Sequence, residues 1–548
     1  MQSLLQWVNT LKDKDVYSNT SLIDTTKYDN LAFWWFLRYR FFFDLSIVFE
    51  SGKKQYRRSL GKFILSRLSR LYILSVILFS FISKLFFPMR VKRKRAEKKV
   101  FVTFNTVDWR GFRDIKTGKY LRGHSLFGPI LRKLSAKTGE VEFFSSYPFG
   151  YSFFSFVKMA LDARISRHLG RFTPLESYLT GRSLIQTLRA RELFSAELSK
   201  MKANNKRKHT FQYHGKDVFT LFQADFEYYY KVYLPLMVQY YELSLDLLEK
   251  ENPDLVLVEN EYVGFERALI YACQKKQIPS LAQQHGLITK DHIGYLYAKE
   301  DISRQEFSHF PYCPLPSCTS VIGPSFQDIL TKISSYPKSK VVVSGQPRYD
   351  VFYFANRIYD RSVFLKRNKL DSKKKLVLLA TQPFHLERLR EEFFVNIIQS
   401  VMPIDGVQIV VKPHPNESEK WFSEKLNSLE TDVLVLPPKS DTIEAIFACD
   451  VFLSVNSTTI LEALIMDKPV VIVNLSKLTE PLPWVKEGAA IGVYEAEKIR
   501  GVIEDVLAKG KTDRQLSKRR SDFVYKYLYK IDGKATDRVI SLMRRLAK

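Results

Sequence analysis

The sequence predicts an α/β protein in which two Rossmann-like, doubly wound domains face a cleft, preceded by an aromatic and basic region that associates with a membrane. Apolar, β-branched runs alternate with helical stretches in the second half of the chain, at 407–412, 432–436, 451–455 and 469–473. Similar strands begin at Val100, Leu255 and Ser280. A length of 548 residues suits two or three domains, and 45% hydrophobic with 26% charged residues is an ordinary globular composition.

Residues 1–97 form the aromatic and basic region, which we expect to attach the protein to a membrane. The aromatic run 33–43 suits either a buried helix or an interfacial one. The apolar segment 71–87 would form a helix of about 25 Å, which is marginal for a membrane span. Basic residues flank it on both sides, which favours an in-plane segment on the cytoplasmic face. A core hairpin of a soluble domain is the alternative.

The charge of the chain indicates an anionic partner. A formal net charge of +27 and a pI near 9.6 suit an anionic membrane surface or a phosphorylated glycan. We find no nucleic-acid-binding motif and expect no nucleic-acid partner. Four cysteines are too few for a disulfide framework, which fits catalytic domains in the cytoplasm, and no signal peptide is evident at the N-terminus.

Residues 98–338 are expected to form the first Rossmann-like domain, with a helical insertion. The loop after its first strand is basic. In a two-domain enzyme this loop faces the space between the domains, so its side chains are candidates for binding an acceptor. The candidate acceptor-binding residues are Arg110, Arg113, Arg122 and His124.

Residues 339–512 are expected to form the second Rossmann-like domain, which carries a phosphate site. After the strand 451–455, Ser457, Thr458 and Thr459 supply hydroxyls and backbone N–H groups at the positive end of a helix. One turn later, the Glu462 carboxylate is suited to accept both hydroxyls of a ribose. This arrangement predicts a nucleotide site.

Two other strand ends of this domain point to the same site. Lys412 and His414 end the strand 407–412 between prolines that cannot continue a β-ladder, so both side chains should point into the crevice. Thr381 and Gln382 end the strand that begins at Lys375. All four are predicted to approach the phosphates of a nucleotide-activated donor.

Four motifs between about residues 250 and 480 resemble, as an ordered set, the GT-B glycosyltransferases of surface and capsule polysaccharide synthesis. They are 412–415 (KPHP), 457–462 (STTILE), 284–286 (QHG) and 345–350 (GQPRYD). That broad group includes bacterial polysialyltransferases and CDP-glycerol glycerophosphotransferases. The resemblance implies that His414 contacts a nucleotide phosphate, and Arg348 joins the donor-binding candidates. The acidic base motif of sialyltransferases is absent, which argues against a sialic-acid donor.

The resemblance implies an inverting transfer of a sugar from a nucleotide-activated donor to a lipid-linked or surface glycan. Such a transfer needs a base for the acceptor hydroxyl. His285 is the first candidate, because imidazole titrates near neutrality, and Glu261 and Glu259 come next, if burial raises their pKa values. No Asp-x-Asp marks a strand end, so we expect neither a metal nor another cofactor.

The basic tail 513–548 is expected to form helices that pack across the domains. Three other functions stay open. A polyol-phosphate transferase using CDP-glycerol would share these motifs, an enzyme like UDP-N-acetylglucosamine 2-epimerase would share the fold, and a non-catalytic assembly subunit would keep the fold without needing His285 or His414.

Overall fold

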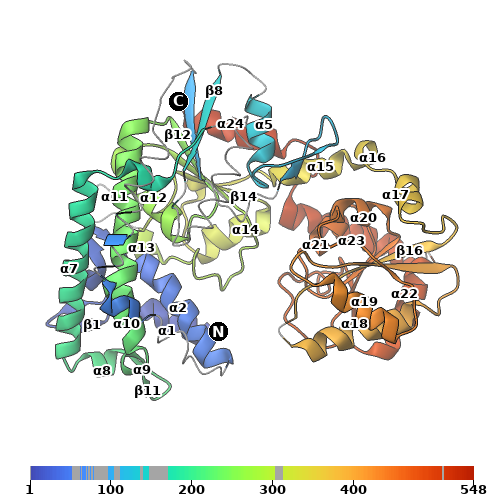
Figure 1. Cartoon of the computed structure of the whole chain (residues 1–548), viewed down its shortest axis with the longest axis horizontal. Helices are drawn as coiled ribbons and strands as arrows, with labels where there is room; N and C mark the ends of the chain where they lie inside the picture. The colour runs from blue at the N-terminus through green and yellow to red at the C-terminus, as the bar shows by residue number, and fades with distance from the viewer. Residues whose placement is uncertain are drawn as a thin grey trace.

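The computed structural model contains two α/β bodies, each built around a parallel sheet (Figure 1). The residues that it describes are 2–51, 62, 64–69, 71, 74, 75, 78, 97–103, 111–135, 140–146, 148, 171–302, 313–384, 386–508 and 511–547. Arg110 and most of the segment 71–87 lie outside the described residues.

The amino-terminal sheet has seven strands in the order β15-β14-β13-β12-β5-β8-β9, all of them parallel. From β5 the chain proceeds outward to β8 and β9 and then returns to β12, which pairs with the other edge of β5. The topological switch point therefore lies between β5 and β12. The strands are β5 (Lys98–Thr103), β8 (Val141–Ser146), β9 (Arg171–Phe172), β12 (Leu255–Val258), β13 (Ser280–Gln283), β14 (Cys318–Val321) and β15 (Val341–Val343).

The carboxyl-terminal sheet has six parallel strands in the order β18-β17-β16-β19-β20-β21, and its switch point lies between β16 and β19. Its strands are β16 (Lys375–Ala380), β17 (Val407–Lys412), β18 (Leu434–Val435), β19 (Val451–Ser454), β20 (Val470–Val473) and β21 (Ile491–Val493). Its helices are α18 (Glu387–Val401), α19 (Glu419–Ser428), α20 (Thr442–Ala448), α21 (Thr459–Ile465) and α22 (Ile499–Leu507). Two Rossmann-like domains of this kind confirm the predicted GT-B fold.

Helices cover both faces of the amino-terminal sheet. On one face lie α7 (Gly181–Ala203), α11 (Leu234–Glu251) and α12 (Gly264–Lys276), whose buried residues join the largest core. On the other face, α5 (Gly128–Ser135) and α24 (Ala535–Leu546) share a second core with β5 and β12. The C-terminal helix is thus part of the amino-terminal domain.

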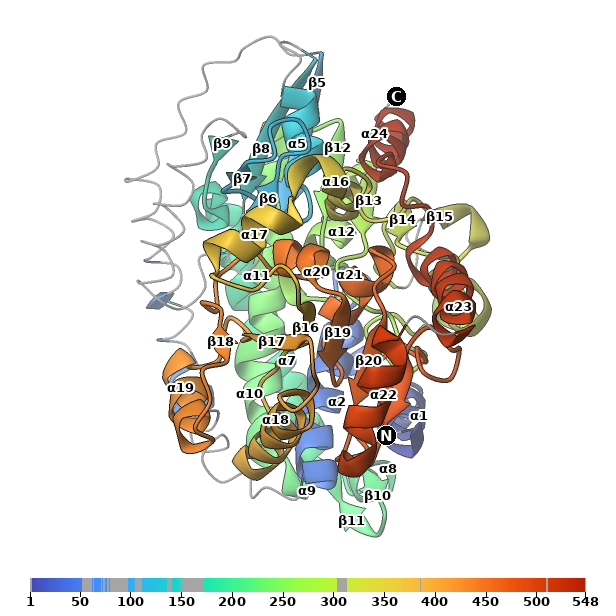
Figure 2. The same cartoon turned by 90° about the vertical axis from the view of Figure 1, so that its right-hand side faces the viewer.

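The chain crosses between the domains more than once. Helix α23 (Lys511–Leu528) contacts both α14 (Pro324–Asp328) of the first domain and α21 of the second. It runs along one flank of the molecule, at the right of Figure 2. The Asp350 carboxylate accepts hydrogen bonds from the backbone N–H groups of Ala535 and Thr536, both at 2.8 Å, and so caps α24.

All of the aromatic run 33–43 except its first residue belongs to α2 (Trp34–Ser51), a largely buried helix that packs beside α1 (Gln2–Leu11). The Trp34 and Trp35 side chains are fully buried. Arg267 of α12 donates to the Trp35 carbonyl, and the Tyr271 hydroxyl donates to the Ala32 carbonyl at 2.9 Å. Core packing is therefore the structural role of this run. Among the described residues, no helix has the length and apolar character that crossing a membrane requires.

Short elements complete the described chain. The two-stranded pieces are β1 (Asp15–Tyr17) with β2 (Thr20–Ser21), β3 (Lys27–Tyr28) with β4 (Leu31–Ala32), β6 (Phe112–Arg113) with β7 (Tyr120–Leu121), and β10 (Gln212–Tyr213) with β11 (Lys216–Asp217). The short helices are α8 (Arg207–Thr210), α9 (Val218–Leu221), α10 (Gln223–Tyr228), α13 (Lys299–Ile302), α15 (Asp350–Tyr353), α16 (Ala355–Ile358) and α17 (Arg361–Arg367).

Candidate functional site

The switch point of the carboxyl-terminal sheet is tied together by side chains from β16 and β19. The Ser454 hydroxyl donates to the Ala380 carbonyl at 2.9 Å, and the Gln382 amide oxygen accepts from the Asn456 N–H at 3.3 Å. Gln382 therefore spans the position at which an open α/β sheet binds its ligand. This rigid junction sets the starting point of the next loop.

Ser457, Thr458 and Thr459 follow that junction and lead into α21. The Ser457 hydroxyl accepts hydrogen bonds from the Thr459 N–H at 3.3 Å and from the Thr459 hydroxyl at 2.8 Å. Thr458 is exposed, and its side chain makes no capping hydrogen bond. The Ser457 and Thr459 hydroxyls thus stabilise the start of α21, and Thr458 is the residue of the three that faces solvent.

Lys412 is buried at the end of β17. Its ammonium donates to the carbonyl oxygens of Pro413 at 2.8 Å and Pro438 at 2.7 Å, so it joins the loops after β17 and β18. Burial lowers its pKa to about 8, although Asp441 and Glu417 act in the opposite direction. Lys412 consequently supplies positive charge beneath the loop rather than an exposed side chain.

Glu417 organises this loop and was not among the residues predicted from the sequence. Its carboxylate accepts hydrogen bonds from the Thr381 hydroxyl at 2.5 Å and from the His414 backbone N–H at 3.0 Å. The Arg390 Nε lies 3.3 Å from the second carboxylate oxygen, and its guanidinium stacks over Trp421 at 3.6 Å. The signal in the sequence was a glutamate three residues after the histidine of the KPHP motif.

The half-buried His414 ring has a defined tautomer. Its Nδ1 accepts a hydrogen bond from the Asn416 backbone N–H at 3.1 Å. In the neutral ring the proton must therefore sit on Nε2, which becomes a hydrogen-bond donor. A donor in this position suits a phosphate oxygen, as the sequence motif implies.

Arg348 lies in the short helical turn Pro347–Tyr349 that follows β15, and its guanidinium donates to the Tyr349 hydroxyl at 3.1 Å. Burial raises the pKa of the Glu462 carboxyl, and the Arg348 guanidinium opposes that shift. Burial also lowers the pKa of His285, and the same guanidinium lowers it further while Glu259 raises it. One cation thus acts on the candidate donor-site carboxylate of the second domain and on the candidate base of the first.

His285 is half-buried two residues after β13, beside the Tyr262 ring. Its Nε2 lies 3.5 Å from the Tyr262 hydroxyl. The Tyr262 ring also contacts the rings of His292 and Tyr39, with centroids at 4.6 Å and 5.2 Å. Because its pKa is lowered from the ordinary value, the His285 imidazole is neutral at physiological pH and has a lone pair with which to accept a proton.

Glu259 and Glu261, the other two candidate bases, are buried. A Glu259 carboxylate oxygen lies 3.2 Å from Nε2 of His124, whose Nδ1 accepts from the backbone N–H groups of Leu126 and Phe127 at 3.2 Å. His124 therefore pairs with Glu259 and caps the turn before α5. This leaves its ring fully buried instead of directed toward an acceptor.

Glu261 uses both of its carboxylate oxygens within the protein. It accepts from the Thr319 hydroxyl at 2.9 Å and from the Tyr336 hydroxyl at 2.7 Å, and burial raises its pKa. These contacts hold the β12 loop against β14. Of the three candidate bases, His285 is the one whose side chain retains partial exposure.

The predicted acceptor residues are placed differently from one another. The Arg113 guanidinium donates to the Gly118 carbonyl at 2.5 Å and forms an ion pair with Asp441 of the second domain. Arg122 is exposed. Asp441, which the sequence analysis did not select, also caps α20 and accepts from the Tyr359 hydroxyl at 3.1 Å.

Comparison with known proteins agrees with a glycosyltransferase-type second domain. Residues 356–480 match the family described as LpxB, lipid-A-disaccharide synthetase, and they include the candidate donor-site residues from Thr381 to Glu462. An uncharacterized protein of Methanocaldococcus jannaschii, MJ1060, is 24% identical over 224 residues, which are 40% of this chain and 36% of that protein. The match therefore spans about a third of the relative's length.

Several solved structures resemble the chain at low identity. UDP-GlcNAc 2-epimerase from Neisseria meningitidis, bound to UDP-GlcNAc, has a TM-score of 0.46 at 15% identity and covers 82% of this chain and 100% of its own. The wall teichoic acid polymerase TagF has a TM-score of 0.45 at 10% identity, covering 88% and 98%. A glycosyltransferase from Rickettsia africae has a TM-score of 0.45 at 10% identity, covering 82% and 99%.

Proposed function

We propose that the protein is an inverting glycosyltransferase that needs no metal and moves a sugar from a nucleotide-activated donor to a lipid-linked or surface glycan. The observation that carries this proposal is the meeting of three loops at the carboxyl ends of β16, β17 and β19, held together by the hydrogen bonds of Glu417 with Thr381 and His414 and of Gln382 with Asn456. A donor held by the second domain would place its reacting carbon toward the candidate base of the first. The LpxB-like match over residues 356–480 supports the same assignment.

The second domain would bind the nucleotide. Nε2 of His414 and the exposed Thr458 hydroxyl would donate to phosphate oxygens, and Glu462 would accept from the ribose hydroxyls. The buried Lys412 ammonium would add positive potential without direct contact. Fixed donors and cations of this kind stabilise the charge that develops on a leaving phosphate, which is the task a metal ion performs elsewhere.

The first domain would bind the acceptor beside His285. In the transfer, the acceptor hydroxyl oxygen forms a bond to the anomeric carbon while the bond from that carbon to the phosphate oxygen breaks. His285 takes the hydroxyl proton, and the nucleotide leaves with the electron pair from the opposite face of the sugar. The rings of Tyr262 and His292 would shield this proton transfer from bulk water.

Thermal unfolding with a panel of nucleotides tests the donor site. We would compare CMP, CDP, UDP, GDP and their sugar adducts on the wild type, on His414→Ala and on His209→Ala, an exposed histidine of α8 outside the site. A ligand at a hundred times its Kd adds about 2.7 kcal/mol of stability. We expect one nucleotide to stabilise the wild type and His209→Ala but not His414→Ala. Stabilisation by none of them would overturn the proposal.

The mass of the acceptor product then separates sugar transfer from glycerol-phosphate transfer, and the stereochemistry of the recovered nucleotide sugar detects an epimerase, whose product has an unchanged mass. Transfer of a hexose adds a sugar residue to the acceptor, whereas a CDP-glycerol enzyme adds a glycerol phosphate. An epimerase converts the nucleotide sugar without any acceptor. A nucleotide that binds but is never turned over, with acceptors present, would favour a non-catalytic subunit.

A further inference from the structure

Three of the described polar side chains between Lys62 and Ser69 are turned inward, whereas Arg67 is exposed. Lys62, Ser66 and Ser69 are buried, at 7%, 4% and 0% exposure, and their spacing places them on one helical face. The Lys62 ammonium pairs with Asp44 at 2.7 Å and also with Asp225. The Ser69 hydroxyl accepts from the Arg191 guanidinium at 2.9 Å. The polar face of this segment therefore contacts the body of the protein.

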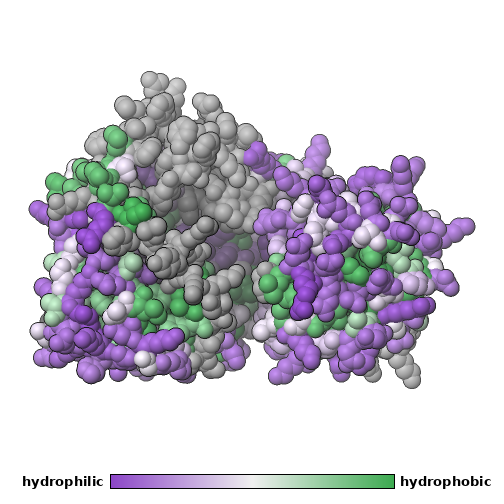
Figure 3. All heavy atoms as spheres, turned by 60° about the horizontal axis from the view of Figure 1, so that its bottom comes forward, coloured by the Kyte–Doolittle hydropathy of each residue, from purple (hydrophilic) through white to green (hydrophobic). Residues whose placement is uncertain are grey.

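The opposite face of the same segment is apolar and exposed. Seven side chains form what we term the apolar ridge, with exposures of 37% to 64%: Ile64, Leu65, Leu68, Leu71, Leu74, Leu78 and, from α7, Ile185. They are seven of the eighteen large hydrophobic side chains that are exposed in the described part of the chain. Figure 3 shows apolar atoms gathered at the upper left, on the amino-terminal body. Such clustering marks an interaction surface rather than scattered surface leucines.

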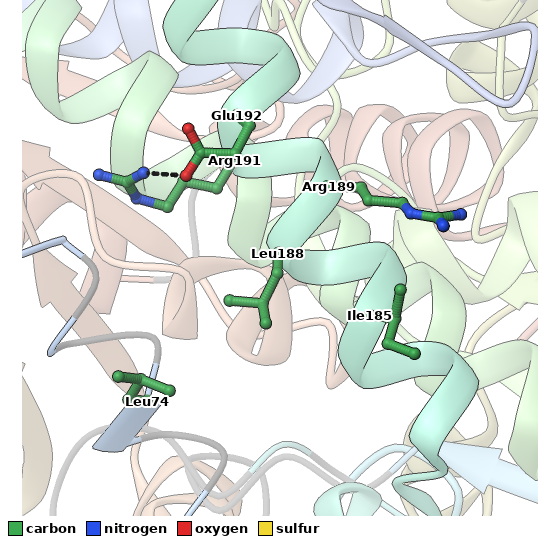
Figure 4. Close-up of a pocket in the computed structure, with 6 residues that line it drawn as sticks. All are labelled: Leu74, Ile185, Leu188, Arg189, Arg191 and Glu192. Atoms are coloured by element: carbon green, nitrogen blue, oxygen red, sulfur yellow. Dashed lines mark hydrogen bonds and ion pairs between the residues drawn. The ribbon is translucent and has the colours of Figure 1, made fainter.

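A cavity of about 460 Å³ opens between Leu74 of the ridge and α7. Figure 4 shows Leu74 on one side of the opening and Ile185 and Leu188 of α7 on the other. The lining is completed by Arg189, Arg191 and Glu192. Arg191 pairs with Glu192 at 2.6 Å, whereas Arg189 is exposed, so the hollow combines an apolar lining with an exposed guanidinium and fits a hydrocarbon chain that carries an anionic head.

Basic side chains surround the ridge. Arg67, next to Leu68, and Arg182 and Arg189 of α7 are exposed. A second copy of this chain, whose formal net charge is +27, would bring like charges together, whereas an anionic lipid surface is complementary. We propose that the apolar ridge inserts into the outer part of a bilayer that contains anionic lipids, with an acyl chain in the cavity beside Leu74. The inference does not depend on the proposed function.

Vesicle sedimentation tests the apolar contribution. Full-length protein would be mixed with vesicles of phosphatidylcholine containing phosphatidylglycerol, and with vesicles of phosphatidylcholine alone. The variant L71N/L74N/L78N should partition onto the anionic vesicles at least about tenfold more weakly than the wild type. Its matched control is L221N/I333N/V363N, which changes three hydrophobic side chains of similar exposure outside the ridge.

Two results would overturn the proposal: the ridge variant sediments like the wild type, or the control loses as much binding.

The charge variant R182E/R189E gives a second test that leaves every leucine in place. It should bind anionic vesicles more weakly, and the binding of the wild type should fall as salt is raised. Vesicle binding that is unchanged both in R182E/R189E and at raised salt would contradict the role of the basic residues.

Sedimentation equilibrium distinguishes a second copy from a membrane. The proposal expects wild type and ridge variant to have the same oligomeric state in solution. A wild-type dimer that dissociates in L71N/L74N/L78N, without vesicle binding by either protein, would assign the ridge to self-association and overturn membrane insertion. Nucleotide-induced stabilisation, measured on the same samples, reports separately on the donor site and on folding.

Discussion

Arg113 and Asp441 form an ion pair that joins the two domains, and the Tyr359 hydroxyl donates to the same Asp441 oxygen at 3.1 Å. The Arg113 guanidinium lies over the Tyr359 ring, 4.9 Å from its centroid. The other Asp441 oxygen accepts from the Ile443 N–H at 3.0 Å and caps α20. One carboxylate thus serves both the contact between the domains and the start of α20, which lies beside the candidate donor site.

Asp441→Asn and Asp441→Ala should separate these two roles. Asparagine is as good an N-cap as aspartate but cannot form the ion pair, so Asp441→Asn should lower the free energy of unfolding by at most about 1 kcal/mol. Asp441→Ala also loses the cap and should cost about 1 kcal/mol more. Urea denaturation measures both values. Equal destabilisation by the two substitutions would show that the cap contributes nothing.

Glu417→Gln should weaken nucleotide binding although Glu417 itself was not predicted to contact the donor. The carboxylate receives hydrogen bonds from Thr381 and His414, and a neutral amide cannot accept them with the same strength. Losing about 1.4 kcal/mol of this preorganisation corresponds to a tenfold weaker Kd. Calorimetric titration with the nucleotide found by thermal unfolding measures it. The matched control is Glu424→Gln in α19, an exposed glutamate whose loss should leave Kd unchanged.

The fold was largely predictable from the sequence because parallel strands are buried on both faces. Strands such as β16, β17 and β19 therefore read as continuous apolar runs, and the polar residues that follow them meet at one edge of the sheet. The donor-site candidates Thr381, Lys412 and Ser457 were found in this way.

The contacts that those side chains make could not be predicted. Lys412 donates to a carbonyl 26 residues away, and Arg113 pairs with a carboxylate 328 residues away. The local sequence does not identify partners that are distant along the chain. A basic residue that is free to bind a ligand therefore cannot be distinguished from one that is already paired within the protein. The run 33–43 had the same ambiguity, which contacts from Arg267 and Tyr271 on α12 resolve in favour of a buried helix.

The buried Lys412 ammonium predicts a pH dependence of stability. Its pKa is lowered from the ordinary 10.5 to about 8, so between these values the unfolded chain binds more protons than the folded one. The free energy of unfolding should therefore rise with pH in that window, by up to about 3 kcal/mol. Below about pH 8 the destabilisation is fully present.

Lys412→Met removes the pH-dependent destabilisation caused by the buried ammonium. The other titrating groups are the same in both proteins, so their effects cancel when the variant is compared with the wild type. The stability difference, wild type minus variant, should therefore shift in favour of the wild type between pH 7.5 and pH 10.5, as urea denaturation would measure. The exposed Lys439→Met provides the control, for which we expect a constant difference. A constant difference for Lys412→Met as well would mean that its ammonium is not buried as described.

His285→Gln tests the candidate base. If His285 takes the acceptor proton, the substitution should lower kcat by about 10²- to 10⁴-fold while the KM for the donor changes little. Glu261→Gln should leave kcat nearly unchanged, because both Glu261 oxygens are occupied within the protein. A full loss of kcat in Glu261→Gln with retained activity in His285→Gln would reverse the assignment.

Glu259 offers a sharper test of the same base, because its negative charge raises the pKa of His285. Burial lowers that pKa and the Glu259 charge raises it, so Glu259→Gln should lower it further. The acid limb of the kcat/KM profile reports the base of the free enzyme, and it should therefore move to lower pH in Glu259→Gln. A residue with a purely structural role would change the height of the profile without moving this limb. An acid limb that moves upward, or stays in place while activity persists, would exclude His285 as the group that titrates.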